Sequence, residues 1–417
     1  MSKCSVKSAL VVGAGIVGVS TAYALQKEGV KVTLVDRKGP CAGTSYGNAG
    51  AIVDGSSVPN AMPGLWKSVP SMLADPTGPL TIRWSYMYKI APWLLRFVNE
   101  SRPHRAEANA AALRALTKNV ASDWLALTKE TALDDLVTDV GWLKVFDSDA
   151  GFEGTKSSRD MMIRHNTEFE VLGMRELRDL EPNLSTIFRH GIFQKRSRFL
   201  LNPERMVVGI ADAFKDIGGD IVISDIHSLQ SDDKGVTAIG SGGVLQADTL
   251  VLCTGAWSKN LAGQFGAKIP LDTERGYHLM FPVIEDKPIQ RPILYGEKSF
   301  VLAPLETGVR MTSQVEFAGL ENGPDFRRVR KLIPYAKKML PSLVTEEKDV
   351  WLGYRPSLPD SLPVIGPSPK DPKVVFAFGH QHYGMSLGPT TAKLVRNIIL
   401  GQPQAIPLWP YRANRFF

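Results

Sequence analysis

Three glycines near the N-terminus constrain the fold of this 417-residue chain more than any other feature. They lie in the sequence Gly13-Ala14-Gly15-Ile16-Val17-Gly18, which directly follows the short apolar run Ser8–Val12. In a G-x-G-x-x-G motif the first glycine permits a tight turn, the second lets the backbone approach a pyrophosphate, and the third lets a helix pack on a strand. We expect that helix over Ile16–Gly29, a second strand over Lys31–Asp36, and ribose hydroxyls bound by the Asp36 carboxylate. This order predicts a βαβ unit that binds a dinucleotide.

The chain leaves the usual nicotinamide-binding pattern directly after the second strand. Past Arg37 no second βαβ unit follows. Instead, the run Thr44-Ser45-Tyr46-Gly47-Asn48-Ala49-Gly50 carries small residues and hydroxyl groups without helical periodicity. Such a stretch is typical of a loop that lies along a second segment of the cofactor, which favours FAD over NAD. A nicotinamide-dependent dehydrogenase with the same fingerprint stays open at this point.

Composition and charge narrow the class of protein. Hydrophobic residues make up 44% and charged residues 22% of the chain, as in ordinary globular proteins, and its length suffices for two cores. The scattered cysteines Cys4, Cys41 and Cys253 have neither disulfide-framework nor metal-ligand spacing, so we expect no metal site. The net charge of +7 fits anionic ligands or an anionic membrane surface. Without a nucleic-acid-binding motif, we expect no nucleic-acid partner.

Neither a signal peptide nor a membrane-spanning run is recognisable. The first apolar run, from Ala9 to Val19, is broken by glycines and lacks a cleavage-site pattern. No other run is apolar for long enough to cross a bilayer. We therefore expect a cytoplasmic protein, either free or peripheral on the inner face of the cytoplasmic membrane.

Strands followed by glycine turns recur in the middle of the chain and near its C-terminus. The patterns predict helices over Ala106–Thr131, Pro203–Ile217, Phe326–Leu340 and Gly388–Leu400, and strands over Thr138–Phe146, Thr186–Phe193, Asp220–Ser228, Ala247–Cys253 and Val374–Phe378, with alternating strands from Pro270 to Thr312. We therefore expect an α/β fold with two domains. Residues 1–58, 190–268 and 350–417 would form a discontinuous Rossmann-like domain for FAD, and residues 59–189 and 269–349 an α+β substrate domain with an antiparallel sheet.

Several motifs in a fixed order point to one family. They are Leu252-Cys253-Thr254-Gly255-Ala256-Trp257-Ser258, Arg275-Gly276-Tyr277-His278, Gly353-Tyr354-Arg355-Pro356, the run Pro359–Gly366, and Gly379-His380 with Gly384. Together with the N-terminal motifs, they make the chain resemble the D-amino acid oxidase superfamily of FAD-dependent oxidoreductases nearly end to end. The likeness is strongest to the bacterial D-amino acid dehydrogenase branch.

The resemblance implies non-covalent FAD, because no cysteine follows Cys253 where some relatives attach the flavin. The family usually has glutamate where Asp36 stands, and the shorter aspartate still suits a ribose. The cofactor-binding residues implied are Gly13, Ala14, Gly15, Ile16, Val17, Gly18, Asp36, Arg37, Thr44, Ser45, Asn48, Ala49, Gly50, Thr254, Gly255, Trp257, Gly353, Gly379, His380, Gly384, Met385 and Ser386.

The resemblance also implies oxidation of a D-amino acid, or of a cyclic D-imino acid such as a D-proline derivative, by hydride transfer from the α-carbon to flavin N5. Arg355 is the expected carboxylate anchor, since a guanidinium binds a carboxylate through two parallel hydrogen bonds. Tyr277, His278, His382 and Tyr383 are candidates to line the substrate site, and each has a packing role as its alternative. An oxygen-using oxidase of glycine or sarcosine and a non-catalytic flavoprotein subunit are the rival functions.

The segment Trp84–Val98 combines aromatic and aliphatic residues with Lys89 and Arg96. Pro92 is expected to break or restart a helix there. One interpretation is a surface that rests on an anionic membrane, where electrons would pass to a quinone or another acceptor. The other is a buried helix pair within the substrate domain.

Overall fold

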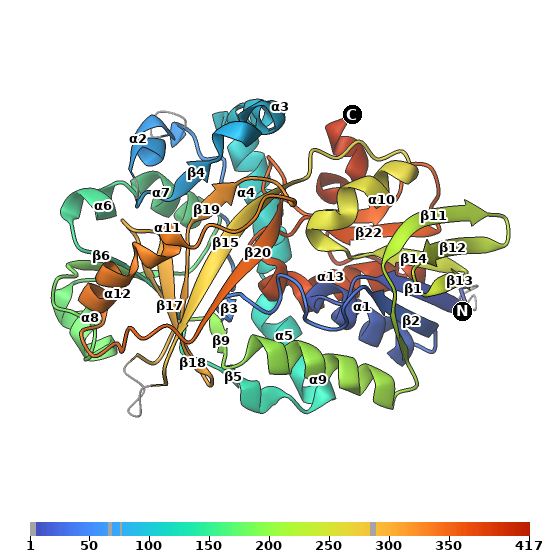
Figure 1. Cartoon of the computed structure of the whole chain (residues 1–417), viewed down its shortest axis with the longest axis horizontal. Coiled ribbons are helices and arrows are strands. Elements are labelled where there is room, and N and C mark those ends of the chain that lie inside the picture. Colours follow the sequence, from blue (N-terminus) through green and yellow to red (C-terminus); the bar gives the residue numbers. More distant parts are fainter. Residues whose placement is uncertain (1–5, 66–68, 76, 284–288) are drawn as a thin grey trace.

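A computed structural model describes residues 6–65, 69–75, 77–283 and 289–417 (Figure 1). One half of the molecule is built on a six-stranded sheet with the order β10-β2-β1-β14-β22-β21. Its strands are β1 (Ser8–Val12), β2 (Lys31–Asp36), β10 (Asp220–Ile223), β14 (Thr249–Leu252), β21 (Val364–Pro367) and β22 (Val374–Phe378). All neighbours pair in parallel except β21 and β22. The central strands are short apolar runs, as expected for strands that are covered on both faces.

Both faces of this sheet are covered. Alternate side chains of β1 point to opposite sides, so Val11 packs against helices on one face and Leu10 against the other cover. The first face carries α1 (Ile16–Lys27), α9 (Pro203–Asp216) and α13 (Gly384–Ile399). The second carries α10 (Ser258–Gln264) and a three-stranded sheet of β11 (Ile226–Asp232), β12 (Gly235–Gly240) and β13 (Gly243–Ala247).

A ten-stranded, mostly antiparallel sheet forms the other half (Figure 1). Its order is β4-β19-β15-β18-β17-β16-β6-β8-β7, and β20 pairs with β15. The strands are β4 (Leu80–Ile82), β6 (Trp142–Phe146), β7 (Glu170–Leu172), β8 (His190–Gln194), β15 (Asp272–Phe281), β16 (Ile293–Tyr295), β17 (Phe300–Leu305), β18 (Gly308–Thr312), β19 (Val315–Phe317) and β20 (Asp349–Ser357). A further small sheet joins β3 (Ala51–Ile52), β5 (Val137–Thr138) and β9 (Arg198–Leu200).

The remaining helices surround these sheets. They are α2 (Val69–Ala74), α3 (Met87–Glu100), α4 (Pro103–Thr117), α5 (Val120–Thr131), α6 (Asp149–Glu153), α7 (Lys156–Arg164), α8 (Met174–Leu180), α11 (Arg327–Arg330) and α12 (Ile333–Met339). The mixed α/β fold agrees with the predicted class. The domain boundaries stay a prediction, and a division by sheets would move β8 and β20 into the substrate half.

Several predicted elements are wrong in their continuity. The helix predicted over Ala106–Thr131 is two helices, α4 and α5, because the carbonyl of Thr117 accepts the Gly55 N–H. The strand predicted over Thr138–Phe146 is split at Gly141, which has a positive φ of 74°. The predicted strand Asp220–Ser228 divides into β10 and β11 at Ser224, whose N–H donates to the carbonyl of Asp36.

Three other predictions differ at their ends or in length. The helix predicted over Phe326–Leu340 forms two short pieces, α11 and α12, and Pro334 lies in the first turn of α12, where its missing N–H costs nothing. The strand predicted from Thr186 begins only at His190, as β8. The final helix begins at Gly384, one turn earlier than Gly388.

The helix α3 runs through Pro92 without a break. A proline this close to the helix start removes one backbone hydrogen bond, and packing of the buried Ile90 and Trp93 holds the helix in place. The outward face is different: Trp84, Tyr88 and Leu95 are 86%, 72% and 73% exposed. The segment is therefore one half-exposed helix preceded by a short turn. The expected break at Pro92 is wrong, and of the two open interpretations the buried helix pair does not describe the segment.

Candidate active site

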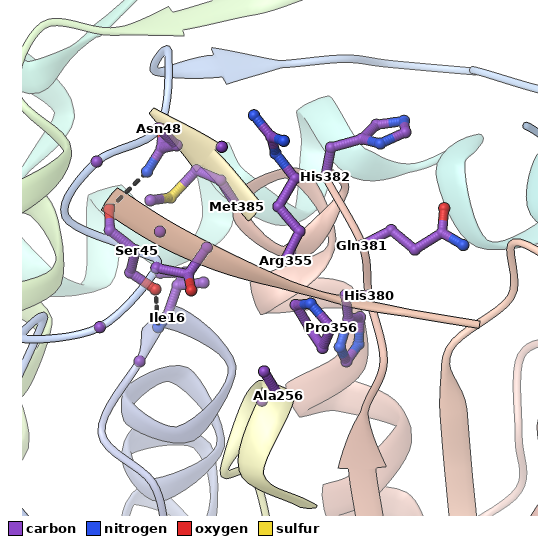
Figure 2. A pocket seen from close by; sticks show the side chains of 18 of the residues that line it. Ile16, Ser45, Asn48, Ala256, Arg355, Pro356, His380, Gln381, His382 and Met385 are labelled. Carbon is purple, nitrogen blue, oxygen red and sulfur yellow. Dashed lines mark hydrogen bonds between the residues drawn. The ribbon is translucent and has the colours of Figure 1, made fainter. Parts of the chain in front are cut away.

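A cavity of about 880 Å³ lies where the two large sheets meet. One side is formed by residues at the carboxyl ends of the parallel strands β1, β2, β14 and β22, the edge at which α/β sheets bind ligands. The other side is formed by β15 to β18 and β20. Figure 2 shows this cavity with Ile16, Ser45 and Asn48 on one side and Arg355 and His382 on the other. The volume is typical of a site that holds a whole cofactor or ligand.

The glycine motif forms the turn that the sequence predicts. Gly13 has a φ of +106°, and a Cβ atom there would overlap the carbonyl oxygen of Cys253. A Cβ atom on Gly18 would overlap the carbonyl oxygen of Gly13, so the start of α1 lies directly on the turn. Gly15, Ile16 and Val17 line the cavity. The N-terminus of α1, with its positive dipole end, therefore faces the site, as an anionic phosphate group requires.

The Asp36 carboxylate lines the cavity and also fixes the turn. One oxygen accepts the N–H of Ala14 at 2.9 Å, and the other accepts those of Lys38 and Gly39 at 2.8 and 3.1 Å. A carboxylate offers about four acceptor positions, so capacity is left for a hydroxyl of a ligand.

Residues 44–50 form a loop that is tied to both halves of the molecule. The Ser45 hydroxyl accepts the Ile16 N–H at 3.0 Å, and the Asn48 side chain donates to the Ser45 carbonyl (Figure 2). On the other side, the Thr44 hydroxyl donates to the carbonyl of Tyr354 in β20. The buried Arg310 of β18 donates to the carbonyls of Tyr46 and Asn48, at 2.8 and 2.9 Å. Sequence reasoning missed Arg310, which holds the shape of this loop.

The turn after β14 adds an aromatic wall. The guanidinium of Arg37 lies 3.9 Å above the Trp257 ring, and Trp257 meets Tyr354 edge to face. Thr254 and Gly255 line the cavity beside them. Such a wall offers a flat surface and a cation to an aromatic, anionic ligand.

Most of the predicted cofactor residues lie in the cavity wall. These are Gly13, Gly15, Ile16, Val17, Asp36, Arg37, Thr44, Ser45, Asn48, Ala49, Thr254, Gly255, Trp257, Gly353, His380, Gly384 and Met385. The others do not line the cavity; they are Ala14, Gly18, Gly50, Gly379 and Ser386. Ser386 accepts the N–H of Val53, a residue of the wall. The contacts of each residue with a cofactor stay a prediction.

Arg355 extends from β20 into the cavity (Figure 2). Its Nη2 donates to the Ser313 carbonyl at 3.2 Å, and its Nη1 lies 3.5 Å from the carbonyl of Gln314. Among the described residues, no carboxylate forms a salt bridge with it. Burial lowers the pKa of Arg355, and the Coulomb interaction with Glu274 opposes that shift. A fixed guanidinium with unused N–H groups is therefore available to an anionic ligand.

The place of Arg355 depends on Gly276 in the neighbouring strand. A Cβ atom on Gly276 would overlap the guanidinium. We therefore expect Gly276→Ala to displace Arg355 and to raise KM for carboxylate-bearing substrates by about tenfold, because roughly 1.4 kcal/mol of binding would be lost. Flavin content should not change. Steady-state kinetics check this against Gly323→Ala, since a Cβ atom on Gly323 meets nothing within 4 Å. Equal KM values for both variants would contradict the packing argument.

The turn before α13 carries the predicted His380, His382 and Tyr383. His380 is buried, and its Nε2 lies 2.9 Å from the Thr391 hydroxyl. His382 reaches the cavity beside Arg355 (Figure 2). The His382 side chain is exposed at the cavity, yet loss of water contacts to the surrounding protein, and secondly the charge of Arg355, lower its pKa to about 4, so the imidazole is neutral at neutral pH. The Tyr383 hydroxyl is 3.0 Å from that of Ser56. His382 is the best placed of the three to contact a ligand.

Tyr277 and His278 face different surroundings. The Tyr277 hydroxyl donates to Glu316 and accepts from Arg275 and from the Asp325 N–H, so it is engaged within a buried polar network. Tyr277 also lines the cavity, but its hydroxyl is already engaged in that network. His278 is fully buried, stacks on Trp351 and lies 3.1 Å from the Gly47 carbonyl. The structure shows packing and loop contacts for both side chains, and a contact of either with a substrate stays a prediction.

The sequence matches the family DAO: FAD dependent oxidoreductase over residues 8–398. The chain belongs to this family. A D-amino-acid oxidase from Bradyrhizobium diazoefficiens is 34% identical over 97% of this chain and 98% of its own length. A D-amino acid dehydrogenase from Paramagnetospirillum magneticum is 29% identical over 98% of both chains. Among solved structures, the glycine oxidase from Geobacillus kaustophilus superposes with a TM-score of 0.72 at 18% identity, covering 98% of each chain, which supports the fold.

The chain is thus a DAO-family oxidoreductase whose cofactor is FAD. The residues present fit that group: two helix N-termini, of α1 and α13, reach the cavity, Gly13 permits a tight turn that a Cβ atom would disrupt, and Asp36 keeps an acceptor position. FAD supplies a two-electron oxidant that accepts a hydride.

Two negative findings concern only the described part of the chain. Within it, no helix has the length and apolarity to cross a bilayer. The same residues contain no group of three His, Cys, Asp or Glu side chains arranged to hold a metal ion.

Proposed function

We propose that this FAD-dependent oxidoreductase oxidises the α-carbon of a D-amino acid, or of a cyclic D-imino acid such as a D-proline derivative. The observation that carries the proposal is Arg355, a half-buried guanidinium without a salt bridge from any described residue, in the same cavity as the dinucleotide-binding elements. The names of the two relatives, D-amino-acid oxidase and D-amino acid dehydrogenase, support the substrate class.

The role of the protein is mainly to orient the substrate. Arg355 would bind the substrate carboxylate, which fixes one end of the molecule and directs the α-hydrogen toward the flavin; such orientation lowers a barrier by several kcal/mol. Loss of a hydride from the α-carbon of a neutral amine gives an iminium ion, and loss of an N–H proton to water converts that ion to the imine. Water then converts the imine to a 2-oxo acid and ammonia, whereas a cyclic imino acid gives a pyrroline carboxylate.

Anaerobic mixing of the purified protein with D-, L- and N-methyl amino acids tests the proposal through flavin absorbance. Bleaching by D-amino or D-imino acids is the expected result. Fast bleaching by glycine or sarcosine with rapid release of peroxide in air would instead favour the rival oxygen-using oxidase. A flavin that stays oxidised with every compound would favour a non-catalytic subunit.

The electron acceptor is the second part of the proposal. We propose a membrane quinone or another electron carrier, reached from an anionic bilayer through the outward face of α3. Trp84, Tyr88 and Leu95 lie along one side of this segment, and Lys89 and Arg96 flank them. Aromatic side chains favour the headgroup level of a bilayer, and basic residues add about 1 kcal/mol each near anionic lipid.

Replacing Trp84 and Leu95 together with serine is therefore expected to reduce binding to vesicles of phosphatidylglycerol and phosphatidylcholine by at least about tenfold, since roughly 1.5–3 kcal/mol is attributed to burial of each large apolar side chain. Flotation of the holoprotein with vesicles measures this. The matched control is the pair Ile163→Ser and Val244→Ser, two exposed apolar residues in other elements. Equal flotation of both double variants would exclude the α3 surface as the docking site.

A further inference from the structure

Glu274 lies next to Arg355 in the ten-stranded sheet. The two residues are directly paired across the antiparallel strands β15 and β20, so their side chains leave the sheet on the same face. Both line the cavity. Glu274 is only 5% exposed, although a glutamate is seldom buried without a partner.

The two opposite charges attract each other but form no direct salt bridge. The guanidinium of Arg355 lies over Gly276 and donates to backbone carbonyls. Among the described residues, the Glu274 carboxylate has no salt bridge. The charge of Arg355 stabilises it most, and the Ser357 hydroxyl and Asp272 are its other near neighbours. Charges withdrawn from water are costly unless they are compensated. An incoming ligand could therefore stabilise both the Glu274 carboxylate and the Arg355 guanidinium.

The surroundings leave few other groups to compensate Glu274. Asp272, on the same face of β15, is already bound by the Tyr86 hydroxyl, at 3.0 and 3.1 Å. His382 is neutral at neutral pH. A ligand that carries a cationic group next to a carboxylate would satisfy Glu274 and Arg355 together.

We infer that Glu274 is a substrate-binding residue that accepts the N–H groups of the substrate amine while Arg355 binds the substrate carboxylate. This inference rests on the proposed function and adds to it a second point of recognition. The cavity thereby selects a zwitterion, because a carboxylate without an amino group would meet the negative charge of Glu274.

The same contact provides a path for the proton that must leave before oxidation. A substrate ammonium donates one proton to a Glu274 oxygen: the N–H bond breaks, an O–H bond forms, and the electron pair stays on nitrogen. Burial raises the pKa of Glu274, which strengthens the carboxylate as a base. The neutral amine can then lose a hydride from its α-carbon to FAD.

The test compares ligands that differ only in the amino group, using calorimetric binding to the oxidised holoprotein without oxygen turnover. The pairs are D-alanine with propionate, and D-proline with cyclopentanecarboxylate. Because D-alanine and D-proline would be oxidised during a titration, their affinities are compared through KM from steady-state kinetics. The two plain carboxylates are measured by calorimetry. In Glu274→Gln, we expect the amino acids to bind about tenfold or more weakly, as for loss of a charged hydrogen bond. The two plain carboxylates should bind several-fold more tightly, because the repulsion is gone.

Changes of opposite sign cannot come from a general loss of stability. Asp272→Asn is the matched control, since it removes a neighbouring half-buried acid that does not line the cavity, and it should leave the ratio between amino acid and carboxylate unchanged. An unchanged ratio in Glu274→Gln would overturn the inference. So would a loss restricted to substrates with cationic side chains, because Glu274 would then bind the side chain.

If Glu274→Gln does not fold, the wild-type protein still decides the question. Propionate bound as tightly as D-alanine would overturn the inference, and a preference of more than about tenfold for the amino acid would support it. Failure of the proposed function looks different, because the wild-type flavin would then not be bleached by any amino acid.

Discussion

Replacing Gly13 with valine is expected to give a protein that contains less than a tenth of its normal FAD. A φ of +106° is unfavourable for any side chain and worst for a β-branched one, and the new Cβ atom would overlap the Cys253 carbonyl. The turn must therefore move away from the N-terminus of α1. A loss of about 3 kcal/mol would lower FAD affinity more than a hundredfold. The ratio of flavin to protein absorbance after purification measures the effect.

The matched control for this variant is Gly263→Ala in α10. A Cβ atom on Gly263 meets nothing within 4 Å, so this protein should keep its flavin. Circular dichroism of both variants separates loss of cofactor from loss of fold. A fully yellow Gly13→Val protein would show that the turn does not hold the cofactor.

Truncation of Arg355 to alanine is expected to raise KM for amino acid substrates by about thirty- to a thousandfold, while FAD stays bound. The reason is that the substrate carboxylate would lose its charged hydrogen-bond partner in a buried site, a loss of roughly 2–4 kcal/mol. Arg355 reaches the cavity from β20, and its backbone-carbonyl contacts are made by the guanidinium alone, so the strand itself should persist. Steady-state kinetics at a series of substrate concentrations give KM, and the flavin absorbance of the purified variant gives its FAD content.

Arg355→Lys provides the conservative comparison. A lysine keeps the positive charge but not the planar fork, so KM should lie between those of the wild type and the alanine variant. For an amine without a carboxylate, KM should differ little between the wild type and the two variants. If Arg355→Ala handles amino acids as the wild type does, the carboxylate is bound elsewhere in the cavity.

The N-terminal βαβ unit could be predicted because its information is local. Gly13 and Gly18 act within one turn, and the apolar runs on both sides of α1 define its strands without help from distant residues. The breaks at Thr117 and Gly141 were missed for the opposite reason. Thr117 ends α4 through a hydrogen bond to Gly55, 62 positions away in sequence, and no pattern within the helix reports that contact.

The candidate site shows the same division. Arg355 lies in a recognisable motif, but its orientation depends on Gly276 in another strand and on backbone carbonyls near the end of β18. Arg310 and Glu274 were missed, although each is a charged residue inside a largely buried strand. A charged residue in a strand that is expected to be buried was the feature of the sequence that could have identified them. Tyr277 lines the cavity while its hydroxyl binds Glu316, and its contact with a substrate stays a prediction, because alternation along a strand indicates two faces without saying which of them a ligand will meet.

Strand β18 affects both the shape of the loop at residues 44–50 and the shape of the pocket around Arg355. Arg310 near its middle holds the loop that lies beside the cofactor-binding turn, while Thr312 at its end and the adjacent Ser313 and Gln314 belong to the wall around Arg355. A shift of this strand that reshapes the pocket for a new side chain would also pull on the loop at residues 44–50. Evolution toward a new substrate is therefore expected to avoid β18 and to proceed through β6, β16 and β17, whose Trp142, Leu294 and Val301 also line the cavity.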